Sequence, residues 1–304
     1  MLEKPTIIVI LGPTASGKTA LSIEVAKKIS GEIISADSRQ VYKGLNLGTG
    51  KVTKKEMAGI PHHLLDVASP KSKFTVAKYQ KLAHQKILEI LKKGKVPIIV
   101  GGTGFYIQSI IDGLNLPAVP PNKSLREKLS QKSTPELFAL LKKLDSKRAG
   151  TIDRQNPARL IRAIEIAKAL GHVPKLQTTN SPFNFVQIGL KTKPNELDQK
   201  IKERLLARMK QGLLAEVKKL HRAGLSWQRM EELGLEYRYL AYFLQNKKSK
   251  EKALAELEQE IRHYAKRQMT WFKRDSRITW FDPADKNLLQ QVLKSIKKVS
   301  LRSP

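Results

Sequence analysis

The chain has 304 residues, 40% of them apolar and 28% charged, which is enough for about two domains with sizeable cores. It contains no cysteine, which excludes disulfides, thiolate zinc sites and a cysteine nucleophile. No apolar run reaches membrane-spanning length and the N-terminus leads directly into a predicted strand, so we expect no signal peptide, no membrane span and a cytoplasmic location. Lys and Arg number 57 against 27 Asp and Glu, and the formal net charge of +30 favours a polyanionic partner such as nucleic acid.

The first predicted elements form a phosphate-binding unit. Residues 6–11 (TIIVIL) are an unbroken β-branched and aliphatic run typical of a strand inside a parallel sheet, and residues 20–29 are predicted to be helical. Between them, residues 12–19 (GPTASGKT) fit the P-loop pattern G-x-x-x-x-G-K-[ST]. The pattern predicts that Lys18 reaches a terminal phosphate and that the Thr19 hydroxyl binds Mg²⁺. The predicted phosphate-binding residues are Gly12, Pro13, Thr14, Ala15, Ser16, Gly17, Lys18 and Thr19.

Three further strands are predicted over residues 31–36, 95–100 and 184–190, with a helix over residues 76–93. This alternation predicts an α/β fold with a parallel sheet that binds ligands at the carboxyl ends of its strands. Asp37 follows the first of these strands and should lie at the same edge as the P-loop. The strand over residues 95–100 ends in Gly-Gly-Thr, where an ordinary P-loop NTPase carries an acid near Mg²⁺. Asp37 could therefore act near a metal, hold an acceptor, serve as a general base, or cap the next turn.

No strand is predicted between Leu116 and Pro182, where 13 Lys and Arg stand against five Asp and Glu. We therefore predict a basic helical domain over residues 115–182, inserted between two parts of the core at 1–114 and 183–304. One of its helices should begin after Asn156 and end at Gly171. Arg159 and Arg162 share a face of this helix, where they could bind phosphates or simply be solvated.

After Leu190 the chain is predicted to be helical almost to its end, with a frayed tail at 297–304. An apolar stripe runs from Leu197 to Met209, beside a row of the cations Lys200, Arg204 and Arg208. The row could bind a shared anion or form a solvated face. Residues 264–274 (YAKRQMTWFKR) mix cations with aromatic side chains, which suits contact with unpaired bases, although Trp271 and Phe272 could belong to the core.

Five motifs together carry a resemblance that covers the chain from Ile7 to about Trp280. They are GPTASGKT, ISADSRQVYKGLNLGTGK, PHHLLD, VGGTGFYI and AKRQMTWF. In this order and spacing they closely resemble the tRNA dimethylallyltransferases (tRNA isopentenyltransferases) of the bacterial type, without a zinc finger. The resemblance implies a P-loop NTPase-like core with an inserted all-helical domain and a helical C-terminal part.

The implied reaction moves the dimethylallyl group of dimethylallyl diphosphate to N6 of the adenine at position 37 of tRNA, just 3′ of the anticodon. The P-loop, with Mg²⁺, would hold the leaving diphosphate. By the resemblance Asp37 is the base, Thr103 lies beside the reacting centre and Arg204 binds the diphosphate. The implied partner is the anticodon stem-loop, and the enzyme is expected to be a monomer. The tRNA-contacting positions carried over are Asp37, Ser38, Arg39, Gln40, Thr103, Arg126, Ala158, Arg159, Leu160, Ile161 and Arg162.

The chain departs from the family pattern at three places. Residues 48–51 read GTGK where GTAK is commoner, Lys200 stands where arginine is usual, and Glu236-Tyr237-Arg238 replaces G-Y-[RK]. Three alternatives stay open: an adenylate prenyltransferase that acts on free AMP, ADP or ATP, a P-loop small-molecule kinase, and a non-catalytic RNA-binding ATPase. The basic insertion and the cationic C-terminal helices count against the first two, and the missing acid after residue 100 counts against the third.

Overall fold

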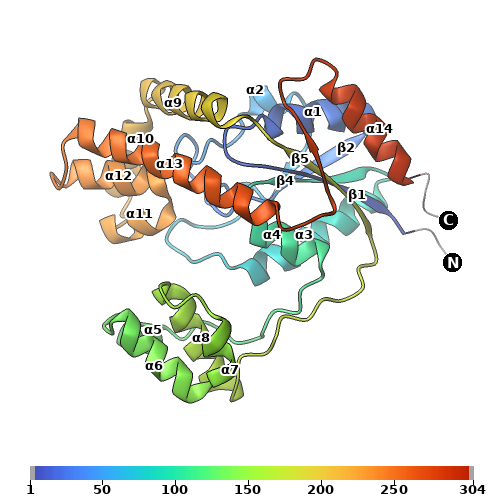
Figure 1. Ribbon diagram of the computed structural model, residues 1–304. Helices are drawn as coiled ribbons and strands as arrows, with labels where there is room; N and C mark the ends of the chain where they lie inside the picture. The colour runs from blue at the N-terminus through green and yellow to red at the C-terminus, as the bar shows by residue number, and fades with distance from the viewer. Residues whose placement is uncertain (1–3, 301–304) are drawn as a thin grey trace. The chain divides into compact units, whose positions relative to one another are not determined.

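The computed structural model describes residues 4–300, with side chains up to Lys298. Two compact units make up the chain: one comprises residues up to Gly113 and from Asn180 onward, and the other spans Leu114–Thr179. The first unit is built on a sheet with the strand order β3-β2-β4-β1-β5-β6, in which every neighbouring pair is parallel (Figure 1). This confirms the predicted α/β class. The strands are β1 (Thr6–Leu11), β2 (Gly31–Ser35), β3 (His62–His63), β4 (Val96–Gly101), β5 (Asn184–Leu190) and β6 (Ile278–Phe281).

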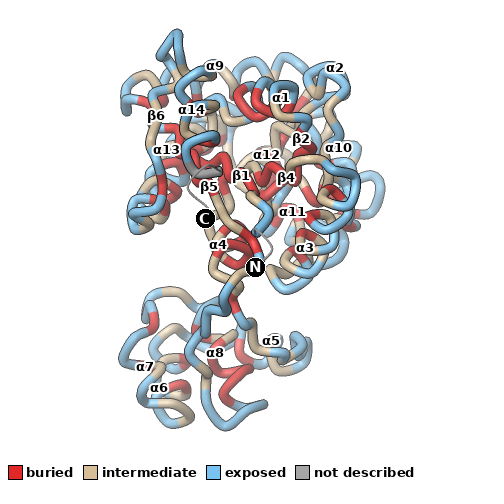
Figure 2. Tube along the Cα trace, turned by 90° about the vertical axis from the view of Figure 1, so that its right-hand side faces the viewer, coloured by how far each residue is buried: buried red, intermediate tan, exposed pale blue. Residues whose placement is uncertain are grey.

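Helices cover both faces of this sheet, which explains why β1 is apolar at every position after Thr6. Ile7 and Val9 face the helices α3 (Val76–Lys92) and α4 (Gly104–Ile111), while Ile8 and Ile10 face α1 (Lys18–Ile29) and α14 (Leu288–Ser300). Successive side chains of a strand point to opposite faces, so a strand between two helical layers needs an unbroken apolar run. Figure 2 shows this burial along the central strands.

The helices after β5 form a cluster of their own. They are α9 (Pro194–Lys210), α10 (Leu213–Arg222), α11 (Trp227–Leu233), α12 (Leu235–Leu244) and α13 (Lys250–Phe272), and a short α2 (Lys54–Met57) precedes β3. As the apolar stripe predicts, Leu197, Ile201 and Leu205 of α9 are buried, and they pack against α13. No helix within residues 4–300 has the length and apolar character needed to cross a membrane.

Two strands were not predicted. The two-residue β3 is too short and polar to give a periodic signal, and the prediction of helix almost to the C-terminus is wrong at β6. This edge strand has four residues and pairs with β5, Gln187 lying opposite Ile278. Such a pairing depends on a distant segment, which local sequence does not report. The predicted fraying is also wrong for residues 297–300, which belong to α14, and residues 301–304 lie outside the described part.

The second unit is helical around its own core, as Figure 1 shows in green. The predicted helix is confirmed as α8. The Asn156 side chain accepts a hydrogen bond from the backbone N–H of Arg159, Pro157 occupies the first turn, and Gly171 ends the helix at a positive φ of 79°. Its buried face, including Leu160 and Ile164, joins the core of the unit. The helices are α5 (Lys123–Ser130), α6 (Thr134–Leu144), α7 (Ser146–Thr151) and α8 (Pro157–Leu170).

Candidate active site

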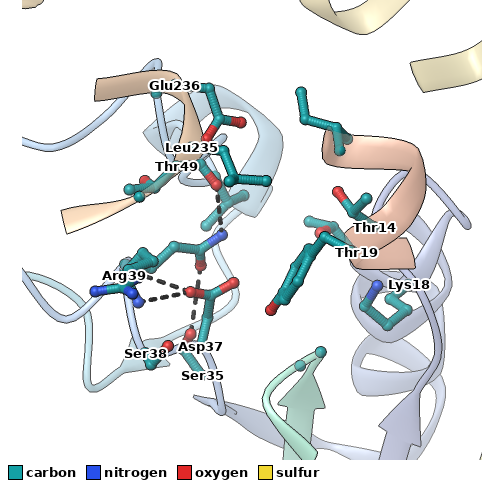
Figure 3. A pocket seen from close by; sticks show the side chains of 18 of the residues that line it. Thr14, Lys18, Thr19, Ser35, Asp37, Ser38, Arg39, Thr49, Leu235 and Glu236 are labelled. Atoms are coloured by element: carbon teal, nitrogen blue, oxygen red, sulfur yellow. Dashed lines mark hydrogen bonds between the residues drawn. The ribbon is translucent and has the colours of Figure 1, made fainter. Parts of the chain in front are cut away.

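A cavity of about 400 Å³ lies at the carboxyl edge of the sheet in the first unit. One wall is formed by the P-loop and the start of α1, which contribute Thr14, Lys18 and Thr19. The facing wall carries Asp37, after β2, and Glu236, from the first turn of α12 (Figure 3). The parallel sheet therefore brings the P-loop and Asp37 to one site, as their positions after two strands predict.

The P-loop is shaped to hold an anion. A Cβ on Gly12 would lie 2.8 Å from the carbonyl oxygen of Leu190, so only glycine fits there. The first turn of α1 has no side-chain cap, which leaves its backbone N–H groups open to a ligand. The Ser16 hydroxyl is buried, and no hydrogen-bond partner is described for it.

Lys18 lies along the P-loop, with its Nζ donating to the carbonyl oxygen of Pro13 at 2.5 Å. Burial lowers the pKa of Lys18 to about 7, and the positive charge of Arg204 adds to the effect while Asp37 opposes it. When burial destabilises the charged form of an ammonium group, an anion beside it stabilises that form. Lys18 is therefore positioned to pair with a phosphate in the cavity.

Asp37 uses one carboxylate oxygen for the backbone and directs its carboxylate into the cavity (Figure 3). Oδ1 accepts from the backbone N–H groups of Arg39 at 2.8 Å and of Gln40 at 3.3 Å. The turn-capping role that the sequence left open is thus observed for this oxygen. The described hydrogen bonds of the carboxylate do not include Oδ2, so the geometry leaves that atom available to a substrate.

Thr103 and Gly101 join the end of β4 to the segment that carries Asp37. The Thr103 hydroxyl accepts from the Ser38 backbone N–H at 3.0 Å, and the Thr103 N–H donates to the Ala36 carbonyl oxygen at 3.2 Å. A Cβ on Gly101 would lie 2.1 Å from that same oxygen. This close approach explains why glycine, and no acid, occupies the end of β4.

Gln268 in α13 connects the P-loop to β4, and the sequence analysis did not identify it. Its buried side chain accepts from the backbone N–H of Thr14 at 2.9 Å and donates to the carbonyl oxygen of Gly102 at 2.8 Å. The residue lies inside the AKRQMTWF motif, on the same helix face as the buried Ala265 and Phe272, and a polar residue at such a position was the available signal. Of the aromatic residues in 264–274, Tyr264 lines the cavity, while Phe272 and Trp271 pack in the core.

Of the three cations in the α9 row, the structure brings two into the cavity wall. Arg204 donates to the carbonyl oxygen of Gly50 at 3.4 Å, and burial, followed by the charge of Arg208, lowers its pKa to about 10. Arg208 pairs with Glu236 at 3.3 Å, and burial raises the pKa of Glu236. Lys200 is exposed and is not part of the wall.

The residues of the second unit that were predicted to contact tRNA have the following neighbours within that unit. Arg126 and Arg162 both bind the buried carboxylate of Glu165, at 2.7 and 2.5 Å. Arg159 lies 3.5 Å from Asp153 and its side chain is 59% exposed. Leu160 is fully buried in the core, so the prediction of a tRNA contact for its side chain is corrected.

Comparisons with known proteins agree on one family. The family model described as IPP transferase matches residues 40–275. The tRNA dimethylallyltransferase of Anoxybacillus flavithermus is 41% identical, over 95% of this chain and 94% of the relative, and that of Bacillus subtilis is 39% identical, over 94% of both. A solved tRNA isopentenylpyrophosphate transferase from Bacillus halodurans is similar with a TM-score of 0.73 and 36% identity, covering 98% of this chain and 96% of that one. A eukaryotic dimethylallyltransferase described as acting on tRNA reaches a TM-score of 0.81 at 25% identity, covering 99% of this chain and 80% of that one.

Proposed function

Because the chain belongs to the IPP transferase family, we propose that it transfers the dimethylallyl group of dimethylallyl diphosphate to N6 of the adenine at position 37 of tRNA. The products are N6-isopentenyladenine in the tRNA and free diphosphate. The observation that carries the proposal is the cavity whose walls place Lys18 and Thr19 opposite Asp37. Such an arrangement suits a reaction in which a diphosphate leaves one reactant while the other loses a proton.

The carboxylate wall provides the proton acceptor. The lone pair of an adenine amino group is delocalised into the ring, so the nitrogen becomes acidic only as it bonds to the allylic carbon. The carbon–oxygen bond to diphosphate breaks in the same step, and its electron pair leaves with the diphosphate. Asp37 takes the proton at the oxygen that faces the cavity, and Thr103 holds the backbone beside it. A target adenine stacked in a loop must be flipped out to reach this position.

The P-loop wall binds the leaving diphosphate. The loop N–H groups, Lys18 and Arg204 supply positive charge where negative charge develops on diphosphate. Residues 4–298 contain no cluster of three or more His, Cys, Asp or Glu side chains that could hold a metal alone. Mg²⁺ would be held by the Thr19 hydroxyl in the cavity wall together with the bound diphosphate, a mode that fits this ion. It would supply positive charge to the leaving group.

The proposed tRNA contacts come from both units. Ser38, Arg39 and Gln40 follow Asp37 at the cavity. The excess of cations in residues 114–179 supports a polyanionic acceptor over a free nucleotide, since a small acceptor needs no such surface. We take the partner to be the anticodon stem-loop and the enzyme to act as a cytoplasmic monomer. The contacts proposed in the second unit are Arg126, Ala158, Arg159, Ile161 and Arg162.

The test is a prenylation assay in which the full chain receives dimethylallyl diphosphate and Mg²⁺ with either an anticodon stem-loop or AMP. Nucleoside mass spectrometry should detect one prenyl group on the adenine 3′ of the anticodon. Preferential prenylation of AMP would replace the proposal with the adenylate prenyltransferase. Steady ATP hydrolysis that Lys18→Ala eliminates, without prenyl transfer, would support the kinase or ATPase alternatives.

A further inference from the structure

Arg208 lies in the cavity wall, and the steps above do not use it. It is four residues after Arg204, so α9 presents both guanidinium groups on one face. A Cβ built on Gly50 would lie 1.7 Å from Nη2 of Arg208 and 2.3 Å from Nη2 of Arg204. The two nitrogens therefore lie side by side, in the space that an alanine methyl group at position 50 would need.

This pair of cations is only partly neutralised by the protein. Arg208 is 12% exposed, and it forms an ion pair with Glu236, itself 17% exposed. Arg204 forms none of the ion pairs described within residues 4–298, although the negative charges of Glu236, Asp37 and Glu56 act on it. Lys18 lies close enough to Arg204 for the two charges to interact. Lys18, Arg204 and Arg208 thus face a cavity that also holds the carboxylates of Asp37 and Glu236, and the excess of positive charge favours a multiply charged anion.

The position of Gly50 is fixed to the helix that carries Glu236. The carboxylate of Glu216 accepts from the backbone N–H groups of Asn46, Leu47 and Gly48 at 2.8–3.1 Å. The hydroxyl of Tyr237, the residue after Glu236, donates to the same carboxylate at 2.7 Å. Gly50 and Glu236, both positions where this chain departs from the family pattern, are therefore held around one guanidinium group.

We propose that Arg208 is a second arginine ligand of the leaving diphosphate, seated beside Gly50 and held by Glu236 when diphosphate is absent. The inference rests on the proposed function, because it takes diphosphate as the ligand. A planar guanidinium donates two parallel hydrogen bonds to phosphate oxygens, and two adjacent guanidinium groups can bind the two phosphate groups. Glu236 and diphosphate compete for Arg208, so loss of the Glu236 charge strengthens diphosphate binding while loss of the Arg208 charge weakens it.

The experiment is isothermal titration of the full chain with inorganic diphosphate and Mg²⁺. Arg208→Gln should weaken binding about tenfold or more, and Glu236→Gln should strengthen it several-fold. Lys202→Gln is the matched control, since it removes an exposed cation from the same helix, and it should stay within about twofold of the parent. Arg208→Lys keeps a positive charge beside Glu236 and loses only the two parallel N–H donors of the guanidinium group. It should therefore weaken binding less than Arg208→Gln.

The binding of the Arg208 and Lys18 variants separates this inference from the proposed function. If Lys18→Ala abolishes binding while both Arg208 variants bind like the parent, the Arg208–Glu236 pair is structural and the inference is overturned. If Arg208→Gln does not fold by circular dichroism, unchanged binding by Arg208→Lys overturns it equally. Diphosphate binding that is absent in the parent, or insensitive to Lys18→Ala, contradicts the proposed function instead.

Discussion

Asp37 divides its carboxylate between two tasks, and this division makes one substitution informative. Asp37→Asn keeps the oxygen that accepts from the Arg39 and Gln40 N–H groups, so the turn after β2 should persist. The amide cannot accept the N6 proton. We expect turnover to be nearly abolished while stem-loop binding stays within a few-fold of the parent, measured by single-turnover prenylation and by titration. Turnover above roughly a tenth of the parent rate would show that another group is the base.

Lys18 gives the site a pH dependence with a defined sign. The folded protein holds this proton only up to about pH 7, whereas an ordinary lysine holds it up to 10.5. Between these values unfolding takes up a proton, so the contribution of Lys18 to the free energy of unfolding becomes less unfavourable as pH rises.

Anion binding needs the charged form of Lys18 and should weaken over the same pH window. Titration with inorganic diphosphate from pH 6 to 9 should therefore show a steeper loss for the parent than for Lys18→Arg, which stays charged. Equal slopes would contradict a lowered pKa, because the titration of diphosphate itself affects both proteins alike.

At the scale of elements, α13 aligns the two loops that frame the cavity. Gln268→Met keeps the side-chain volume but removes both hydrogen bonds, leaving the Thr14 N–H and the Gly102 carbonyl without this partner. We expect a loss of about 1–3 kcal/mol in the free energy of unfolding, together with weaker diphosphate binding. Urea unfolding and titration measure the two effects. Gln199→Met, at an exposed position of α9, is the control and should change neither. Unaltered diphosphate binding in Gln268→Met would mean that the P-loop keeps its shape without α13.

The sequence predicted the elements that have a strong local signal and missed the contacts that depend on distant parts of the chain. Stretches rich in aliphatic and β-branched residues predicted β1, β2, β4 and β5 within a residue at each end, because strands between two helical layers bury such side chains. Position after a strand then predicted that Asp37 and the P-loop share an edge. Gln268 and Glu236 were beyond this reasoning, since their partners lie far away in the chain. Arg126 and Arg162 were predicted from sequence as tRNA contacts, yet only the structure shows both bound to Glu165.

For the whole molecule, charge is the property that the second unit shares with the rest of the chain. Residues 114–179 have 13 Lys and Arg and five Asp and Glu, a net +8 of the total +30. The excess of positive charge is thus spread over both units. Cations of each unit that bind phosphates of a stem-loop would release counterions from the RNA. A free AMP offers a single phosphate group and would release few.

Stem-loop binding should therefore weaken steeply with salt, and single cations should account for parts of the slope. Arg159 is the suitable probe in the second unit, because its ion pair with Asp153 joins two exposed side chains, whereas removing Arg162 would also disturb the buried Glu165. Arg159→Gln should flatten the plot of log K against log salt by about one unit, as expected for one lost phosphate contact. Lys92→Gln, an exposed cation at the end of α3 and thus at the sheet edge opposite the cavity, should leave the slope unchanged. Titrations of the full chain at several salt concentrations measure both slopes. A steep parental slope that neither variant alters would place the phosphate contacts away from Arg159, and equal flattening by both would point to general charge attraction without a defined surface.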